Sequence, residues 1–284
     1  MEKVFKNYNI LIDQFNKNKS LVEEYFYYII AVSLFMNEKH LILNQEVYDY
    51  LFVELVKKIN NGSLGPLSDY KDYYSRLNVH SINAEIIKYL KDAKNNLANP
   101  TPLGSAILEF EKLISINRKG WIIRDVPESY YESDALHTMQ MFATISMLCA
   151  SKQISLDEPK KIYEMILIHE IGEIIAGDIM EIDPKHNNKN VLEEIGVRKT
   201  FENIECGEYF INLWAEFESK KTMIARLAYE IDKLDAVLKA NYLAHELNRI
   251  DLIKDFFYYE ENRNTFASSE VKPLFEIVRS LNFK

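Results

Sequence analysis

Hydrophobic side chains recur every three or four residues along most of this chain, which is the spacing of one face of an α-helix. Within residues 1–36 this spacing places Val4, Tyr8, Leu11 and Phe15 on one helical face. Similar apolar faces recur further along the chain. Few segments alternate hydrophobic and polar residues at period two, as a half-buried strand would. The pattern therefore predicts an all-α protein.

The helical stripes are separated by capping and turn residues. Asn44 is a suitable N-cap for one helix, and Ser155 and Glu158 form a capping box before another. Only 8 glycines and 7 prolines occur in 284 residues, which favours long helices over a many-turned β-fold. We expect helices over residues 1–36, 44–58, 82–96, 104–116, 132–150, 155–177, about 190 onward, 205–218, 221–247 and 269–281.

A segment with two prolines divides the helical pattern of the chain into two parts. Asn99-Pro-Thr-Pro102 is the strongest break in the helical pattern. We therefore predict an N-terminal helical region of unknown role at residues 1–103 and a second helical unit at residues 104–284.

Composition and charge narrow the class of protein. The net charge is −9, so a phosphate backbone would be repelled and nucleic acid is not an expected partner. Cys149 and Cys206 are too few for a disulfide framework, which favours a reducing compartment. The uncharged run at residues 25–36 is shorter than the roughly 20 residues of a membrane span. We expect a cytoplasmic protein that does not enter a membrane, with no signal peptide at residues 1–6.

The best candidate for chemistry lies in the isoleucine-rich segment 165–178. It places His169 and Glu170 mid-helix, with Glu173 one turn beyond His169 on the same face. Ionisable groups on an apolar face are costly unless they are paired or bound to a cation. With His137 upstream and Asp232 downstream on other amphipathic helices, the pattern predicts a divalent-cation site.

Several separated motifs resemble the HD-domain metal-dependent phosphohydrolases, in their 5′-deoxynucleotidase-type branch. The resemblance covers roughly residues 105–247. Its motifs are Gly120-Trp-Ile-Ile-Arg124, Glu132-Ser-Asp-Ala-Leu-His137, His169-Glu-Ile-Gly-Glu173, Ala176-Gly-Asp-Ile179, Leu213-Trp-Ala-Glu-Phe-Glu218 and Ile231-Asp-Lys-Leu-Asp235.

The resemblance implies an HD-domain helical bundle that holds one divalent metal ion, whether Mn, Co, Fe, Ni, Zn or Mg. Four residues match the metal ligands of the family: His137, His169, Glu170 and Asp232. Glu173 matches a catalytic acid that orients or deprotonates water, and Asp178 matches a second acid near the leaving oxygen.

Substrate binding is implied for the loop that carries Arg118, Trp121 and Arg124, because arginine suits a phosphate group. We favour Arg124 over Arg118 there, and for Trp121 packing is an equal alternative. The implied reaction releases phosphate from nucleoside 5′-monophosphates by attack of a metal-bound water. The expected partner is thus a small phosphorylated substrate, a nucleotide, and the resemblance is compatible with a homodimer.

Two departures from the family pattern leave alternatives open. Glu170 replaces the usual aspartate, and Leu136 stands where these nucleotidases carry an acid directly before the first histidine. Asp134 lies three residues before His137 instead. Either change could reshape the pocket for another phosphorylated molecule, such as a nucleoside triphosphate. A further alternative is a non-enzymatic metal-binding module whose aromatic N-terminal helices recruit a partner.

Overall fold

The computed structural model describes residues 1–75, 100–151, 154, 159–180, 182–184 and 186–283. These residues form helices without a β-strand, which confirms the predicted all-α class. The α-helices are α1 Glu2–Lys17, α2 Lys19–Glu38, α3 Gln45–Ile59, α4 Lys71–Tyr74, α6 Pro102–Glu109, α7 Lys119–Ile122, α8 Asp134–Ala150, α9 Pro159–Ile168, α10 Glu173–Ala176, α11 Lys189–Phe201, α12 Gly207–Ser219, α13 Met223–Glu246, α14 Ile250–Asn262 and α15 Lys272–Asn282. Short 3₁₀ helices lie at Gly65–Tyr70, Phe110–Ile114, Glu128–Tyr130 and His186–Asn188.

Most predicted helices form close to their expected positions. The Asn44 side chain accepts a hydrogen bond from the Val47 amide at 3.3 Å and so caps α3 as predicted. Thr101 caps α6 in the same way, within the predicted break at residues 99–102. The helix expected at 82–96 and the capping box at 155–158 lie outside the described residues.

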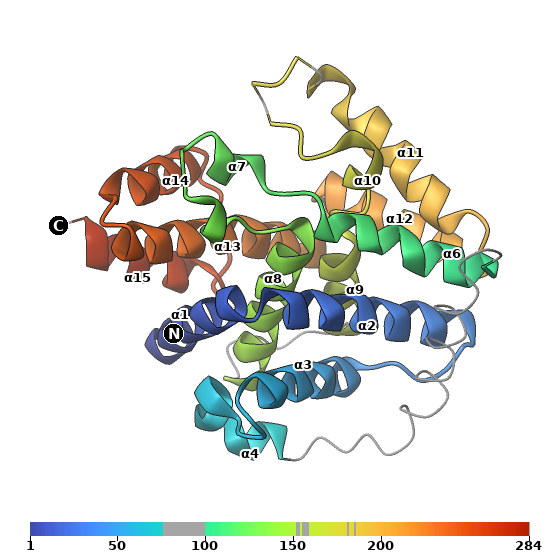
Figure 1. The fold of residues 1–284 in the computed structure, drawn as a ribbon, viewed down its shortest axis with the longest axis horizontal. Helices are drawn as coiled ribbons and strands as arrows, with labels where there is room; N and C mark the ends of the chain where they lie inside the picture. The colour runs from blue at the N-terminus through green and yellow to red at the C-terminus, as the bar shows by residue number, and fades with distance from the viewer. Residues whose placement is uncertain (76–99, 152–153, 155–158, 181, 185, 284) are drawn as a thin grey trace.

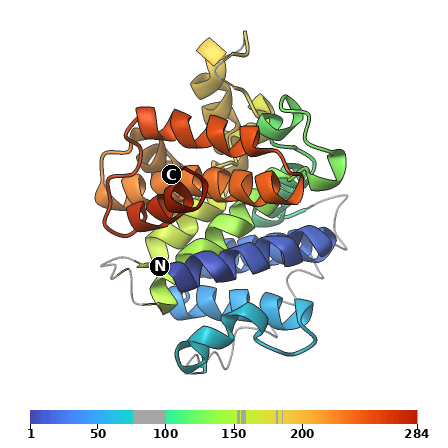
Figure 2. The ribbon, with the colours of Figure 1, turned by 90° about the vertical axis from the view of Figure 1, so that its left-hand side faces the viewer.

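Helix α8 lies at the centre of the fold, and each of its residues is buried. It is packed by α1 and α2 on one side and by α9 and α13 on the other. In Figure 2 the dark-blue N-terminal helices lie between α3 and α4 below and the orange and red C-terminal helices above. This position explains why a helix that carries His137 has no solvent-facing side.

The prediction of one continuous helix over residues 155–177 is wrong, because the helix is interrupted at residues 169–172. Helix α9 ends at Ile168 and α10 begins at Glu173, with turns between them. Two backbone bonds in these turns, from Ile171 to Ile168 and from Glu173 to Glu170, span three residues rather than four. His169 and Glu170 therefore lie on a tight turn and not mid-helix.

Three further α-helices were not predicted: α4, α7 and α14. Helix α14 packs against α13, and α7 forms a single turn in the segment expected to be a polar loop. Among the described residues, no helix combines the length and the apolar character needed to span a membrane. The division of the chain at residues 103 and 104 stays a prediction.

Candidate metal centre

The four predicted ligands lie together although they come from three separate stretches of chain. His137 is on α8, His169 and Glu170 are in the turn after α9, and Asp232 is on α13. One nitrogen or oxygen of each lies within 4.8 Å of those of the other three, and all four residues are buried. Two imidazoles and two carboxylates suit a divalent ion of the Mn to Zn series.

The His137 imidazole is held by carboxylates at both nitrogens. Its Nδ1 lies 2.7 Å from Asp235 Oδ2, and its Nε2 lies 3.2 Å from Asp232 Oδ1 and 3.7 Å from Glu170 Oε1. Because a deprotonated carboxylate can only accept, Nδ1 donates its hydrogen to Asp235. Asp235 thus orients the His137 imidazole from the side away from the other ligands.

His169 is oriented by the main chain instead. Its Nδ1 lies 2.6 Å from the Ile166 carbonyl oxygen, which can only accept, so Nδ1 carries the hydrogen. Its Nε2 is buried, lies 3.3 Å from Glu170 Oε1 and has no hydrogen-bond partner among the described residues. A buried nitrogen without a hydrogen-bond partner is costly, and a cation bound to the neutral imidazole would satisfy it. This orphaned atom shows that the cluster fits a metal ion.

The carboxylates of the cluster are held in their charged form. Burial opposes ionisation of Glu170, but the charges of His169 and Arg118 outweigh it and keep its pKa well below the usual value. Burial likewise opposes ionisation of Asp232, whose pKa Lys233, His137 and Arg118 lower in the same way.

His137 responds to these negative charges. Burial and the charge of Arg118 lower its pKa, but hydrogen bonds to Asp232 and Asp235 outweigh them and raise the pKa to about 10. The cluster thus attracts positive charge strongly, which is what a cation-binding site requires.

Of the three predicted substrate residues, only Arg118 contacts the cluster. Its guanidinium pairs with Glu170 and lies 3.8 Å from Asp232 Oδ1. Arg124 instead stacks over the Phe256 ring at 4.4 Å and lies 3.5 Å from Asp255 Oδ2. The geometry therefore favours Arg118 over Arg124, the reverse of our preference from the sequence.

Trp121 faces the interior of the protein. Its side chain is buried, its indole nitrogen donates to Glu132 Oε1 at 2.7 Å, and its ring lies 4.8 Å from that of Phe256. These contacts match the packing alternative for this residue.

The two predicted catalytic acids border the cluster. Burial raises the pKa of Glu173 well above its usual value, and the charges of Glu170, Asp134 and Asp178 raise it further. Asp178 accepts a hydrogen bond from the Lys119 amide, which ties it to the loop that carries Arg118. A carboxylate with a raised pKa is a stronger base than an ordinary glutamate, which suits a role in proton transfer.

Asp134, the acid that the sequence places three residues before His137, is buried close to the site. Burial together with the charge of Glu170 raises its pKa well above the usual value. The three-residue spacing puts it on the same helical face as His137. Lys189 was missed by sequence reasoning. It lies 3.7 Å from Glu173 Oε1 and 3.3 Å from Glu193 Oε1, and no sequence pattern marks it.

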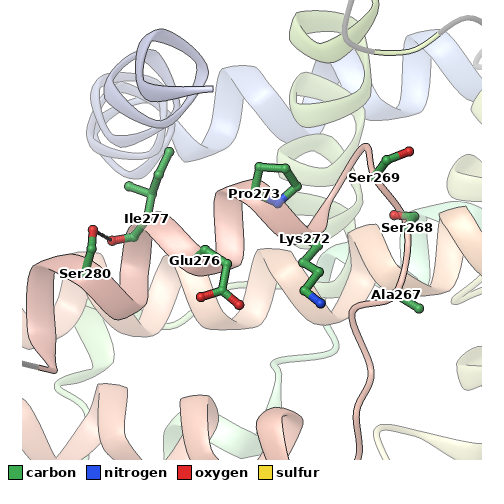
Figure 3. A pocket seen from close by; sticks show the side chains of 8 residues that line it. All are labelled: Ala267, Ser268, Ser269, Lys272, Pro273, Glu276, Ile277 and Ser280. Atoms are coloured by element: carbon green, nitrogen blue, oxygen red, sulfur yellow. Dashed lines mark hydrogen bonds between the residues drawn. The ribbon is translucent and has the colours of Figure 1, made fainter.

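A surface pocket elsewhere is unrelated to this cluster. It is lined by the loop at residues 267–269 and by side chains of α15, all of which are shown in Figure 3. Its lining contains none of the predicted site residues.

Several known proteins are similar to this chain. The chain is 27% identical to a 5′-deoxynucleotidase HDDC2 from Xenopus laevis over 60% of its length and 85% of that protein. It is 29% identical to the same-named protein from Dictyostelium discoideum, over 57% of this chain and 89% of that one. A solved structure described as a predicted metal-dependent phosphohydrolase from Magnetospirillum magnetotacticum aligns with a TM-score of 0.45 and 21% identity, covering 63% of this chain and 89% of that chain.

A family model described as HD domain matches residues 110–271, which is more than half of the chain and includes all of the predicted site residues. The protein therefore belongs to the HD domain family.

Proposed function

We propose that this protein is a metal-dependent phosphohydrolase that releases phosphate from nucleoside 5′-monophosphates. The observation that carries the proposal is the convergence of His137, His169, Glu170 and Asp232 on one buried point. Relatives named 5′-deoxynucleotidase, which match over most of their own length, support the substrate class.

The four clustered side chains would hold the ion. A divalent ion bound there would lower the pKa of a coordinated water and polarise a phosphoryl oxygen. Arg118, already beside two of the ligands, supplies paired donors for the phosphate oxygens.

Glu173 and Asp178 manage the protons of the reaction. Water forms a new bond to phosphorus while the bond from phosphorus to the ester oxygen of the nucleoside breaks. Glu173, whose pKa is raised, takes the proton that the water loses. Asp178, which accepts a hydrogen bond from the Lys119 amide, assists protonation of the departing 5′-oxygen. The products are a nucleoside and inorganic phosphate.

A phosphate-release screen tests this proposal. The metal-free protein is supplied with Mn²⁺, Co²⁺, Mg²⁺ or Zn²⁺ and with nucleoside mono-, di- and triphosphates, and products are identified by mass. We expect inorganic phosphate from monophosphates with at least one of the ions. Release of tripolyphosphate from a triphosphate would instead favour the triphosphate alternative, and no turnover together with no bound metal would favour a non-enzymatic module.

Glu173→Gln is the matched variant, because it keeps the size of the side chain and removes its ability to take a proton. We expect at least a 100-fold loss of kcat, within the range for a general base, with metal content unchanged. Undiminished turnover of this variant would reject the assigned role of Glu173.

A further inference from the structure

The N-terminal helix α1 lies directly beside the candidate metal centre although it is outside the region that matches the HD domain model. It packs against α8 and α13, the helices that carry His137 and Asp232. The family match begins at residue 110. Whatever α1 contributes to the site is therefore additional to the matched region.

One side chain of α1 reaches the support of a predicted ligand. The Tyr8 hydroxyl donates to Asp235 Oδ1 at 2.5 Å, and Asp235 Oδ2 accepts from His137 Nδ1 at 2.7 Å. All three side chains are fully buried, so water does not compete for these bonds. Both oxygens of the Asp235 carboxylate are thus engaged, one by α1 and one by α8.

The chain of contacts fixes which nitrogen of His137 faces the cluster. A carboxylate held at both oxygens cannot rotate away from the imidazole, so Nδ1 keeps its hydrogen and Nε2 points to Asp232 and Glu170. Partners of this kind orient ligating histidines, and their loss weakens metal binding.

We propose that Tyr8 is a positioning residue for the metal centre, acting through Asp235 on His137. The inference rests on the proposed function, since it takes His137 as a metal ligand. It gives the otherwise unassigned N-terminal region a defined part in the site.

Other contacts dock α1 independently of the Tyr8 hydroxyl. Asn16 accepts a hydrogen bond from Lys239 at 2.9 Å, and Asp13 accepts one from Tyr242 at 3.2 Å. Both partners are on α13. A Tyr8→Phe substitution keeps the buried ring and these bonds, so it removes the link to Asp235 without undocking the helix.

The test is a calorimetric titration of Mn²⁺ into the metal-free full-length protein. We expect Tyr8→Phe to raise the Kd for Mn²⁺ by about 3–10-fold, less than the roughly 10–100-fold of a partner that contacts the ligand itself, such as Asp235. Tyr48→Phe is the matched control, since its hydroxyl is also buried but bonds to Ser33 and Glu164. It should leave the Kd unchanged.

A double-variant cycle separates positioning from general loosening. If Tyr8 acts through Asp235, then Tyr8→Phe should change the Kd by less than twofold in an Asp235→Asn background. Wild-type affinity in Tyr8→Phe, or effects of the two substitutions that simply multiply, would overturn the inference.

The outcomes also distinguish this inference from the proposed function. A wild-type protein that binds Mn²⁺ and releases no phosphate would refute the activity, while the comparison of Kd values still decides the role of Tyr8. An active enzyme with an unchanged Kd in Tyr8→Phe would refute only the role of Tyr8. A wild-type protein that binds no divalent ion would refute both.

Discussion

The length of the Glu170 side chain sets where its carboxylate lies in the cluster. From the turn after α9, Oε1 reaches to 3.3 Å from His169 Nε2 and 3.7 Å from His137 Nε2. An aspartate on the same backbone would end about one C–C bond short, roughly 1.5 Å. The extra methylene of glutamate thus accounts for the reach of this carboxylate to both imidazoles.

We therefore predict that Glu170→Asp weakens metal binding, although the HD-domain phosphohydrolases that the sequence resembles usually carry aspartate at this position. The expected change is about a tenfold rise in the Kd for Mn²⁺, of the size caused by a displaced ligand. Glu170→Gln, which keeps the length and removes the charge, should weaken binding at least as much. Tighter binding by the aspartate variant would show that the backbone adapts to the shorter side chain.

The thiol of Cys149 is buried on α8. Burial, reinforced by the charge of Asp49, raises its pKa to about 12. At pH 8 only about one thiol in ten thousand is then ionised, and the thiolate is the reactive form. We predict no reaction of Cys149 with a thiol reagent over minutes under native conditions and full reaction in denaturant. Rapid native labelling, located by mass spectrometry, would contradict this.

At the scale of elements, close approach between α11 and the turn after α9 shapes the site. A Cβ placed on Gly172 would lie 2.6 Å from Glu193 Cβ and 2.9 Å from its Cα. A Cβ on Gly196 would lie 2.6 Å from the Gly172 carbonyl oxygen. Only glycine at both positions allows this packing, and it presses the turn that carries His169 and Glu170 against α11.

We predict that Gly172→Ala destabilises the protein by about 1–3 kcal/mol, as overpacking of a tight contact does, and also weakens metal binding. Urea denaturation measures the first effect and metal titration the second. Gly120→Ala is the matched control, because its Cβ would meet Phe256 Cζ at an ordinary 3.8 Å. Its free energy of unfolding should stay within about 0.5 kcal/mol of the wild type.

N-cap residues and apolar spacing in the sequence predicted those helices whose ends depend on neighbouring residues of the chain. The side chain of Asn44 begins α3, and the apolar stripe of residues 221–247 forms α13 almost as expected. The interruption after Ile168 was missed because it depends on Gly172 meeting Gly196, a contact between residues distant in sequence. Helical periodicity alone continues through this turn and cannot reveal it.

The same limit applies to the candidate site. The motifs predicted which four side chains converge, and the structure brings them together. They did not indicate that Arg118 rather than Arg124 turns toward the cluster, because both arginines lie on one short loop. They also did not reveal Tyr8, whose contact with Asp235 joins residues more than 200 positions apart.

Over the whole molecule, the N-terminal helices and the region matched by the family model share one continuous hydrophobic core. A buried polar network also crosses between them. Asp49 on α3 accepts hydrogen bonds of 2.6 Å from both Ser146 on α8 and Tyr163 on α9. Because unpaired buried carboxylates are costly, these contacts fix the position of α3 against the centre of the fold.

Metal binding should stabilise this shared core, because the ligands join α8, the turn after α9 and α13. An ion that binds only the folded state adds about 2.7 kcal/mol at a hundredfold excess over its Kd. For a chain of 284 residues we predict a rise in Tm of about 5 °C with Mn²⁺, reversed by a chelator. Differential scanning fluorimetry measures the shift.

Two histidine variants make that measurement specific to the cluster. His169→Ala removes the buried nitrogen that lacks a hydrogen-bond partner among the described residues, and it should abolish the shift. His40→Ala removes an exposed imidazole that pairs with Glu205, and it should leave the shift intact. Because both substitutions delete one imidazole, a difference between them depends on location alone. A shift that survives in His169→Ala would mean that the ion stabilises the fold from another site.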